Sequence, residues 1–396
     1  MKHFGVLVGA AVLLFLRKRA IFAPALYAED GSVYLIEAFR DGLNSLLTRY
    51  AGYYQLLSRS VAYASTFLPV RFIPTAFLIY SSVLIFSVYY FFWISNLSRN
   101  HKFIFLTMFL LIPVEGEVYF NLTNSIWFCG LALFIMLNQV EPNCLRLRIS
   151  SYFLMALFCL NGLACIFLAP LYILRAVFDQ SRYRFITAGI TLTCAAIQSY
   201  GMVSQNNQKF NSYSSILSWA NVFTERIILK PFFNNTWFPW DLRDQPHIWI
   251  FLVLFLVQAV YISIKRRNFL IFSAVFFLTM ILCATGMRLR DASSLTHTFN
   301  GDRYIFTPTI LIAIILVEYL TVIRLKLWRN VIYFFCSAYI LTGFKYFTFL
   351  QYADSKWVER SQCVGGKSQC NITIAPDGFQ IHYDPSWKYL HSWQRH

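Results

Sequence analysis

Residues 73–97 read IPTAFLIYSSVLIFSVYYFFWISNL, a long apolar run without one charged side chain. An α-helix rises 1.5 Å per residue, so about 20 apolar residues cross the hydrocarbon core of a bilayer, which is about 30 Å thick. The run is long enough to do so, and similar runs recur from one end of the chain to the other. The sequence therefore predicts an all-α protein that crosses the membrane several times.

The composition points to the same class. Of 396 residues, 58% are hydrophobic and 13% are charged, whereas a soluble domain carries about 25% charged residues. The length rule predicts about 11 membrane-spanning helices. Their approximate ranges are 4–22, 73–97, 103–118, 126–140, 151–164, 165–178, 185–204, 247–264, 269–287, 304–323 and 331–350. The pair 151–164 and 165–178 can instead form one long helix that is broken near Asn161-Gly162.

The positive charges indicate how the chain is threaded. The net charge is +16, and short basic clusters occupy alternate connections between the apolar segments. Basic loops stay in the cytoplasm. This places the N-terminus inside and four segments on the outer side: 23–72, 205–246, 288–303 and 351–396. The basic triplet Arg17-Lys18-Arg19 is the exception to this threading. Because no soluble domain is available to carry a basic patch, nucleic acid is excluded as a partner.

The predicted organisation is a membrane domain over residues 1–350 and a small outer cap over 351–396. The cap contains Cys363 and Cys370, which flank a polar Gly-Gly-Lys-Ser stretch and can form a disulfide outside the cytoplasm. The other cysteines lie in or beside apolar segments and are expected to be small buried side chains. Residues 33–47 have the pattern of an amphipathic helix at the membrane surface.

The first candidate site is the adjacent acidic pair Glu29-Asp30, at the start of the first outer segment. A positioned carboxylate can act as a general base that takes a proton from a hydroxyl group. The alternative is structural, because an acid just before a helix can cap it, and Asp30 precedes a possible helix start near Ser32.

A second cluster of polar residues interrupts an apolar region near the outer surface. It contains two acids in the stretch Pro113-Val114-Glu115-Gly116-Glu117, followed by amide and indole side chains. Charged groups and irregular backbone at membrane depth usually line a cavity. A plain surface turn between two helices is the competing interpretation. The members considered for substrate binding are Glu115, Glu117, Asn124 and Trp127.

A third cluster supplies arginines on the outer side, where the topology rule does not require them. Arg288, Arg290 and Arg303 could bind phosphate, because a guanidinium group forms paired hydrogen bonds with phosphate oxygens. Arg303 is the strongest of the three, since it lies where the next helix begins. The alternative is a solvated loop with local ion pairs. His297 is isolated and is expected to be structural.

Several sequence stretches together resemble a known family. They are Ala28-Glu29-Asp30-Gly31-Ser32-Val33-Tyr34, Tyr50-Ala51-Gly52-Tyr53-Tyr54, Ser58-Arg59, Leu68-Pro69, residues 115–127, Gly301-Asp302-Arg303-Tyr304 and the tail with Trp357, Cys363, Cys370 and Pro376-Asp377-Gly378. The likeness is to the GT-C superfamily of polytopic glycosyltransferases that use lipid-phosphate sugars. Within it, the chain resembles the bacterial and phage-borne glucosyltransferases that modify O-antigen and convert serotype.

This resemblance implies an inverting transfer of a sugar, with glucose expected, from undecaprenyl-phosphate-sugar to the O-antigen of lipopolysaccharide, on the periplasmic face of the bacterial inner membrane. Asp30 or Glu29 would be the base, with Asp30 preferred. Arg303, helped by Arg290 or Arg288, would hold the donor phosphate. Tyr53 and Tyr54 join the second cluster as substrate contacts. A flippase and a donor synthase are implied partners.

Some members of the superfamily bind a divalent metal, but two adjacent acids alone make a poor metal site, so we expect no cofactor. Two other functions remain open at this point. A transporter or flippase for a lipid-linked sugar would need charged residues along a path through the membrane. An O-antigen polymerase would need a larger arginine-rich outer loop than this chain contains.

Overall fold

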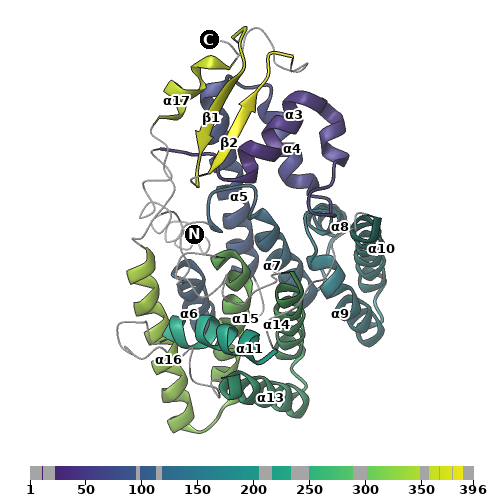
Figure 1. Cartoon of the computed structure of the whole chain (residues 1–396). Helices are drawn as coiled ribbons and strands as arrows, with labels where there is room; N and C mark the ends of the chain where they lie inside the picture. The colour runs from purple at the N-terminus through teal and green to yellow at the C-terminus, as the bar shows by residue number, and fades with distance from the viewer. Residues whose placement is uncertain are drawn as a thin grey trace.

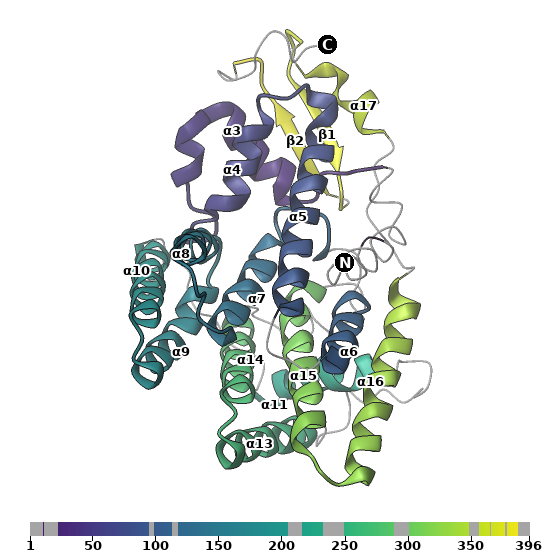
Figure 2. The same cartoon turned by 180° about the vertical axis from the view of Figure 1, so that it is seen from behind.

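The computed structural model describes Ala11 and residues 23–94, 99–112, 118–204, 216–232, 249–288, 301–347, 356–364, 366–376 and 378–386. Within these ranges the chain is mostly helical and has two parts (Figures 1 and 2). We call the larger part the helical body. Its helices are α5 (Ile73–Trp93), α6 (Arg99–Leu110), α7 (Ser125–Asn138), α8 (Leu145–Cys159), α9 (Ala164–Asp179), α10 (Arg182–Ser204), α11 (Ile216–Phe223), α13 (Trp249–Arg266), α14 (Phe269–Arg288), α15 (Asp302–Val322) and α16 (Lys326–Phe347).

Five helical stretches of the described chain are long and apolar enough to cross a membrane: Val70–Trp93, Arg182–Ser204, Trp249–Arg266, Phe269–Met287 and Asp302–Val322. They correspond to predicted segments, and they support an α-helical membrane protein. The predicted segment at 4–22 lies outside the described residues. The total of 11 spans therefore stays a prediction.

The remaining predicted segments are helical but do not meet this standard. α6 and α7 are apolar but short, and α8 and α9 have 15 and 16 residues. α8 and α9 are separate helices, because Gly162 between them adopts a φ of 118° that a helix does not allow. Pro170 lies inside α9 without ending it.

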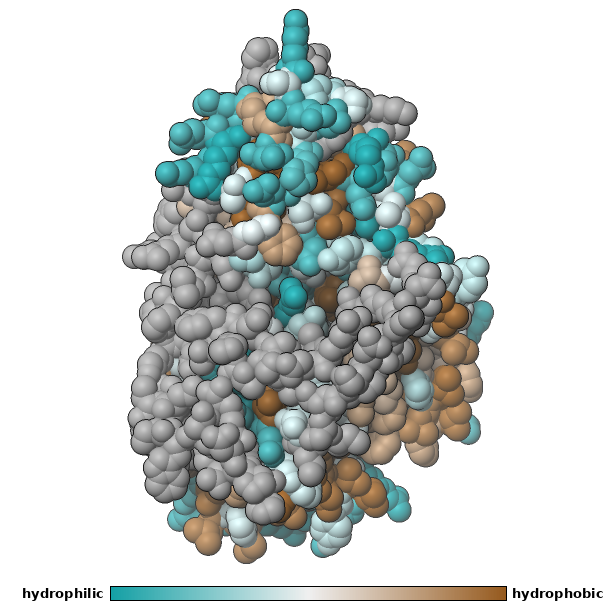
Figure 3. All heavy atoms as spheres, viewed as in Figure 1, coloured by the Kyte–Doolittle hydropathy of each residue, from teal (hydrophilic) through white to brown (hydrophobic). Residues whose placement is uncertain are grey.

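α15 is the centre of the helical body. Of its most apolar stretch, 89% is buried inside the protein. Figures 1 and 2 show α6, α14 and α16 around it, and Phe306 on α15 packs against Phe109, Tyr119 and Phe128. The outer helices, in contrast to α15, expose apolar side chains. On α10 these are Leu192, Tyr200 and Val203. Hydrophobic surface is visible on that side in Figure 3, as lipid contact requires.

The smaller part lies at one end of the helical body. It includes the predicted C-terminal cap and part of the N-terminal segment, and from here on we call this whole part the cap. Its N-terminal half consists of η1 (Asp30–Leu35), α3 (Ile36–Asp41), η2 (Gly42–Leu47) and α4 (Leu56–Ser65). Its C-terminal half consists of α17 (Trp357–Arg360), η8 (Ser361–Cys363), β1 (Cys370–Ile374) and β2 (Phe379–Tyr383). The exposed surface of the cap is largely hydrophilic (Figure 3).

The two halves of the cap share one hydrophobic cluster. Tyr34 and Phe39 from the first half pack in the same cluster as Trp357 and Ile372 from the second. The predicted boundary at residue 350 therefore separates two sequence segments that fold together. The prediction of an all-α fold also missed the hairpin, in which β1 and β2 pair antiparallel with Ile372 opposite Ile381.

The predicted amphipathic helix at 33–47 is divided in the structure. Gly42 has a φ of 58°, which ends α3 and starts a tighter helical segment, η2. Tyr34 and Phe39 are buried before this break, whereas Leu43 and Leu47 after it are 61% and 72% exposed. The apolar residues of this stretch therefore do not form one continuous face. Those before Gly42 pack inside the cap, and Leu43 and Leu47 after it are on the surface.

Candidate functional site

The acidic pair lies where the chain enters η1, at the junction of the cap and the helical body. Ala28, just before the pair, adopts a φ of 45°, and the Asp30 amide donates a hydrogen bond to the Tyr27 carbonyl at 2.8 Å. This tight turn gives the two neighbouring carboxylates different directions. Their surroundings differ accordingly.

The Asp30 carboxylate is completely buried and is bound to the start of α7. Thr123 donates to Asp30 Oδ1 from its backbone N–H and from its hydroxyl, both at 2.7 Å. The Leu122 N–H donates to Asp30 Oδ2 at 3.2 Å. One interpretation of the sequence was that Asp30 caps its own helix. The structure shows instead that its carboxylate is bound by the turn before α7. It joins the cap to the turn before α7.

Burial has a strong effect on this carboxyl group. Removal from water raises the pKa of Asp30 to about 7, although the hydrogen bonds from Thr123 and Leu122 act in the opposite direction. Both oxygens already accept hydrogen bonds, and the residue has no exposed surface. Asp30 is thus well suited to anchoring and has no accessible oxygen for a substrate.

Glu29 is only partly buried and keeps one oxygen unbonded. The Tyr50 hydroxyl donates to Glu29 Oε1 at 2.9 Å. Glu29 Oε2 is shielded from solvent and has no hydrogen-bond partner among the described residues. A buried acceptor without a partner is uncommon in native proteins and calls for an explanation.

Tyr50 is held in place by its own turn and by its neighbours. Its backbone pairs with Tyr53, with N–H···O distances of 3.0 and 3.2 Å in the two directions, and Gly52 supplies the φ of 90° that the turn requires. The ring of Tyr34 contacts the ring of Tyr50 edge to face, with 6.1 Å between centroids. The Tyr50 hydroxyl is therefore directed at Glu29 by a fixed scaffold.

Arg303 approaches the same place from the helical body. It follows Asp302, which is buried in an ion pair with Arg226 at the start of α15. Burial and the Glu29 carboxylate raise the pKa of Tyr50, whereas the positive charge of Arg303 lowers it. Arg303 is thus close enough for its charge to act on the hydroxyl group that binds Glu29.

An aromatic contact completes the arrangement. The Arg303 guanidinium lies 5.3 Å from the centre of the Tyr304 ring, and Tyr304 contacts Trp127 edge to face at 5.8 Å. Trp127 belongs to the first turn of α7, just after the turn that binds Asp30. Its indole nitrogen, Nε1, is shielded from solvent and has no partner among the residues that the structure describes.

We call this set of side chains the junction site. Its members are Glu29, Asp30, Tyr50, Thr123, Trp127, Arg303 and Tyr304. They come from the cap, from α7 and from α15, segments that lie far apart in the sequence. The junction site offers a carboxylate oxygen and an indole N–H that have no hydrogen-bond partner in the described part of the chain, together with a guanidinium group.

The other predicted site residues have several outcomes. Asn124 is buried at the start of α7, where its backbone N–H donates to Asn121 Oδ1 at 2.8 Å. Tyr54 contacts other residues: its backbone binds Gln198, and its ring lies 5.1 Å from the Arg49 guanidinium. Residues Glu115, Glu117 and Arg290 lie outside the described residues, as does the side chain of Arg288.

Sequence reasoning missed Thr123 and Arg226. Thr123 lies between the two asparagines of the second cluster, so its polar neighbours were a usable signal. Arg226 follows an acid in an otherwise apolar stretch, and a basic residue there should have been considered with Arg303. It lies in η5 (Thr224–Leu229), a π-helical segment, and such segments are frequent at functional sites.

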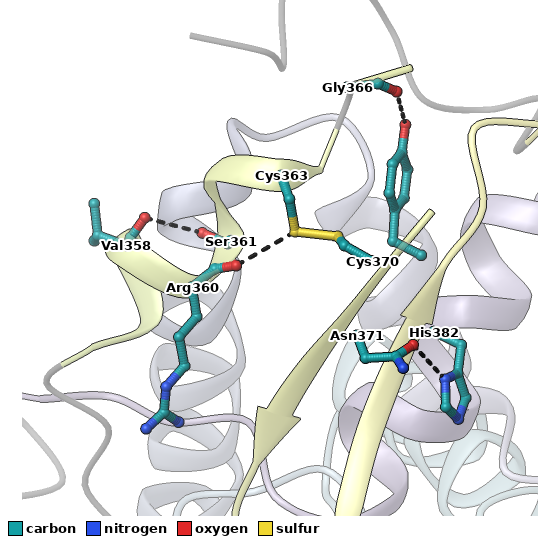
Figure 4. Close-up of a disulfide and its surroundings, with 9 residues drawn as sticks. Val358, Arg360, Ser361, Cys363, Gly366, Cys370, Asn371 and His382 are labelled. Atoms are coloured by element: carbon teal, nitrogen blue, oxygen red, sulfur yellow. Dashed lines mark hydrogen bonds between the residues drawn. A yellow bond between two sulfur atoms is a disulfide. The ribbon is translucent and has the colours of Figure 1, made fainter. Parts of the chain in front are cut away.

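Cys363 and Cys370 form a disulfide in the C-terminal half of the cap (Figure 4). In the described ranges, no group of three or more His, Cys, Asp or Glu side chains could hold a metal ion. No protein-family model, curated protein or solved structure matches the chain. The geometry of the junction site is therefore the main basis for a functional proposal.

Proposed function

We propose that this protein is a membrane glycosyltransferase that moves a hexose from a polyprenyl-phosphate donor to a polysaccharide hydroxyl group. In the form suggested by the sequence resemblance, the donor is undecaprenyl-phosphate-glucose and the acceptor is the O-antigen of lipopolysaccharide. The reaction would take place on the periplasmic face of the bacterial inner membrane. A flippase and a donor synthase would supply the donor.

The observation that carries this proposal is the pair of unbonded atoms in the junction site. Glu29 Oε2 can accept a hydrogen bond and Trp127 Nε1 can donate one, and neither has a partner among the described residues. A sugar hydroxyl both donates and accepts, and sugar rings stack on aromatic faces. The hydroxyl groups of a bound hexose have the chemistry to satisfy either atom.

We assign the general base to Glu29 and not to Asp30, which reverses the preference drawn from the sequence. The assignment follows from the hydrogen bonds already made, because a base needs an oxygen that can accept the proton, and Glu29 Oε2 has no partner among the described residues. Both Asp30 oxygens are already bound to Leu122 and Thr123 in a fully buried position. Asp30 is then a positioning residue that holds the neighbouring Glu29 against the helical body.

The proposed chemistry balances as one displacement. Glu29 Oε2 takes the proton of the acceptor hydroxyl, whose oxygen attacks the anomeric carbon of the donor. The bond between that carbon and the phosphate oxygen breaks, the configuration inverts, and polyprenyl phosphate leaves with the electron pair. Arg303 would bind the leaving phosphate, because a guanidinium group stabilises charge that develops there.

The proposal can be tested in a bacterial strain with a defined O-antigen. Wild type, Glu29→Gln, Asp30→Asn, the double variant and Arg303→Gln are produced at equal levels, and the lipopolysaccharide sugars are measured. We expect Glu29→Gln to lower transfer about 100-fold or more, because the base is removed while the shape is kept. Glu359→Gln is the matched control, since Glu359 is an exposed acid of the cap.

Three results would overturn the proposal. Full modification by the double variant would exclude both carboxylates as the base. A changed chain length without added sugar would indicate a polymerase. Movement of a lipid-linked sugar across vesicles that hold the purified protein, without transfer to an acceptor, would indicate a transporter.

A further inference from the structure

The C-terminal hairpin lies directly on the segment that carries Glu29. Tyr27 and Ala375 form a parallel β-bridge, and the Ala28 N–H donates to the Ala375 carbonyl at 2.5 Å. Figure 1 shows β1 and β2 beside the first elements of the cap. A segment from the end of the chain therefore fixes the backbone one residue before the acidic pair.

Gly31, one residue after the pair, is in contact with the same hairpin. A Cβ atom at Gly31 would lie 2.7 Å from Ile374 Cδ1 and 2.8 Å from Ile381 Cδ1. Both isoleucines are buried in the hydrophobic cluster of the cap, so their methyl groups have little room to move. The backbone of Gly31 does not have a positive φ, so its conformation does not require glycine. What requires glycine here is the lack of space for a side chain.

The hairpin is itself fixed at a distance from this contact. The Trp357 indole N–H donates to the Val70 carbonyl at 3.0 Å, at the base of α5. The disulfide ties η8 to the first residue of β1, and the Tyr383 hydroxyl donates to the Gly366 carbonyl at 3.1 Å (Figure 4). The tail thus forms a braced unit with two attachments to the first outer segment.

Glu29 lies between two anchors of different origin. On one side, Ala28 is bound to the hairpin and adopts a φ of 45°, a conformation that alanine rarely keeps without support. On the other side, Asp30 is bound to the turn before α7. The hairpin sets the backbone, and the helical body sets the next side chain.

We infer that the C-terminal hairpin is a positioning element of the junction site, which holds Glu29 in register with Arg303. This inference rests on the proposed function for its effect on activity. It makes the tail a part of the catalytic unit rather than a separate cover. Ala375, Ile374 and Ile381 are its positioning residues.

The test uses the full-length protein in detergent and a steric rescue. Gly31→Ala inserts the methyl group that meets Ile374 and Ile381. Ile374→Val with Ile381→Val removes the two Cδ1 methyls, and the triple variant combines all three changes. Gly189→Ala on α10 is the control, because a Cβ at Gly189 meets nothing within 4 Å.

Two quantities are measured for each variant. Hydrogen–deuterium exchange of the peptide around residues 27–35 reports the position of the acidic segment without reference to activity. The kcat and KM for hexose transfer report the chemistry. We expect Gly31→Ala to increase the exchange and to lower kcat about tenfold, with KM changed little, because the base is displaced while binding groups on α7 and α15 remain.

The triple variant should return both quantities close to those of the Ile374→Val/Ile381→Val variant. Unchanged exchange in Gly31→Ala, or a loss that the valines do not restore, would overturn the inference. If the wild type transfers no sugar, the proposed function fails, and the exchange measurement still decides whether the hairpin holds the segment.

Discussion

The helical body and the cap are stabilised in different ways. The body surrounds α15 with other helices and exposes apolar side chains on α10, so its order comes from burial between helices and from the surrounding lipid. The cap has a small hydrophobic cluster and a hydrophilic surface, and it joins segments more than 300 positions apart in sequence. The difference teaches that the body provides a frame, whereas the cap places one carboxylate at its edge.

The strongest way to break this comparison is to disconnect the two parts at Asp30. Asp30→Asn turns an acceptor that faces the Leu122 N–H into an amide NH2, so two donors oppose each other. We expect the cap to lose about 2 kcal/mol of stability, and transfer activity to fall with it. Thermal unfolding in detergent and the rate of hexose transfer are measured together.

Asp41→Asn provides the comparison for this substitution. Asp41 forms a surface ion pair with Arg40, and such pairs contribute about 0–1 kcal/mol. If both variants unfold at the wild-type temperature, Asp30 does not connect the cap to the body.

A smaller effect is expected from Tyr50→Phe. The change removes the hydroxyl that donates to Glu29 Oε1 at 2.9 Å but keeps the ring contact with Tyr34. Glu29 then gains a second unbonded oxygen and loses its fixed direction, so kcat should fall about tenfold while the cap stays folded. Steady-state kinetics check this. Tyr333→Phe is the control, because Tyr333 is an exposed tyrosine of α16. A wild-type kcat would show that Tyr50 does not orient the base.

The last effect concerns pH. The pKa of Asp30 is about 7 in the folded protein, above its ordinary value of about 3.9. The folded state therefore holds a proton that the unfolded state has already released, and the contribution of Asp30 to stability falls as pH rises from about 4 to about 7. The melting temperature should decrease by a few degrees over that interval.

The same scan in Asp30→Asn isolates this contribution, because the variant has no titrating group at that position. Its melting curve should depend less on pH than that of the wild type. An equal slope in both proteins would assign the pH dependence to other groups.

The sequence predicted the helical body better than the cap. Long apolar runs identify helices such as α5 and α15, because the hydrophobic pattern and the length rule act locally. The hairpin was not predicted, since Ile372 and Ile381 alternate with polar residues only over five-residue strands. The break at Gly42 was hidden by an apolar pattern that continues across it.

The candidate site was predicted in part for a similar reason. Composition drew attention to Glu29, Asp30 and Arg303, because acids are scarce and outer arginines need an explanation. The choice between the two acids could not be made from adjacent letters. It depends on Thr123 and Tyr50, which meet the pair only after the chain has folded.

The shared cluster of the cap has a consequence for biosynthesis. Residues 26–39 leave the ribosome more than 300 residues before their packing partners at 357–383. The first half of the cap must therefore wait, with Tyr34 and Phe39 uncovered by these partners, until residues 357–383 have been translated. A ribosome that stalls before β1 would release a chain that contains the helical body but lacks the hairpin that binds Ala28 beside the acidic pair.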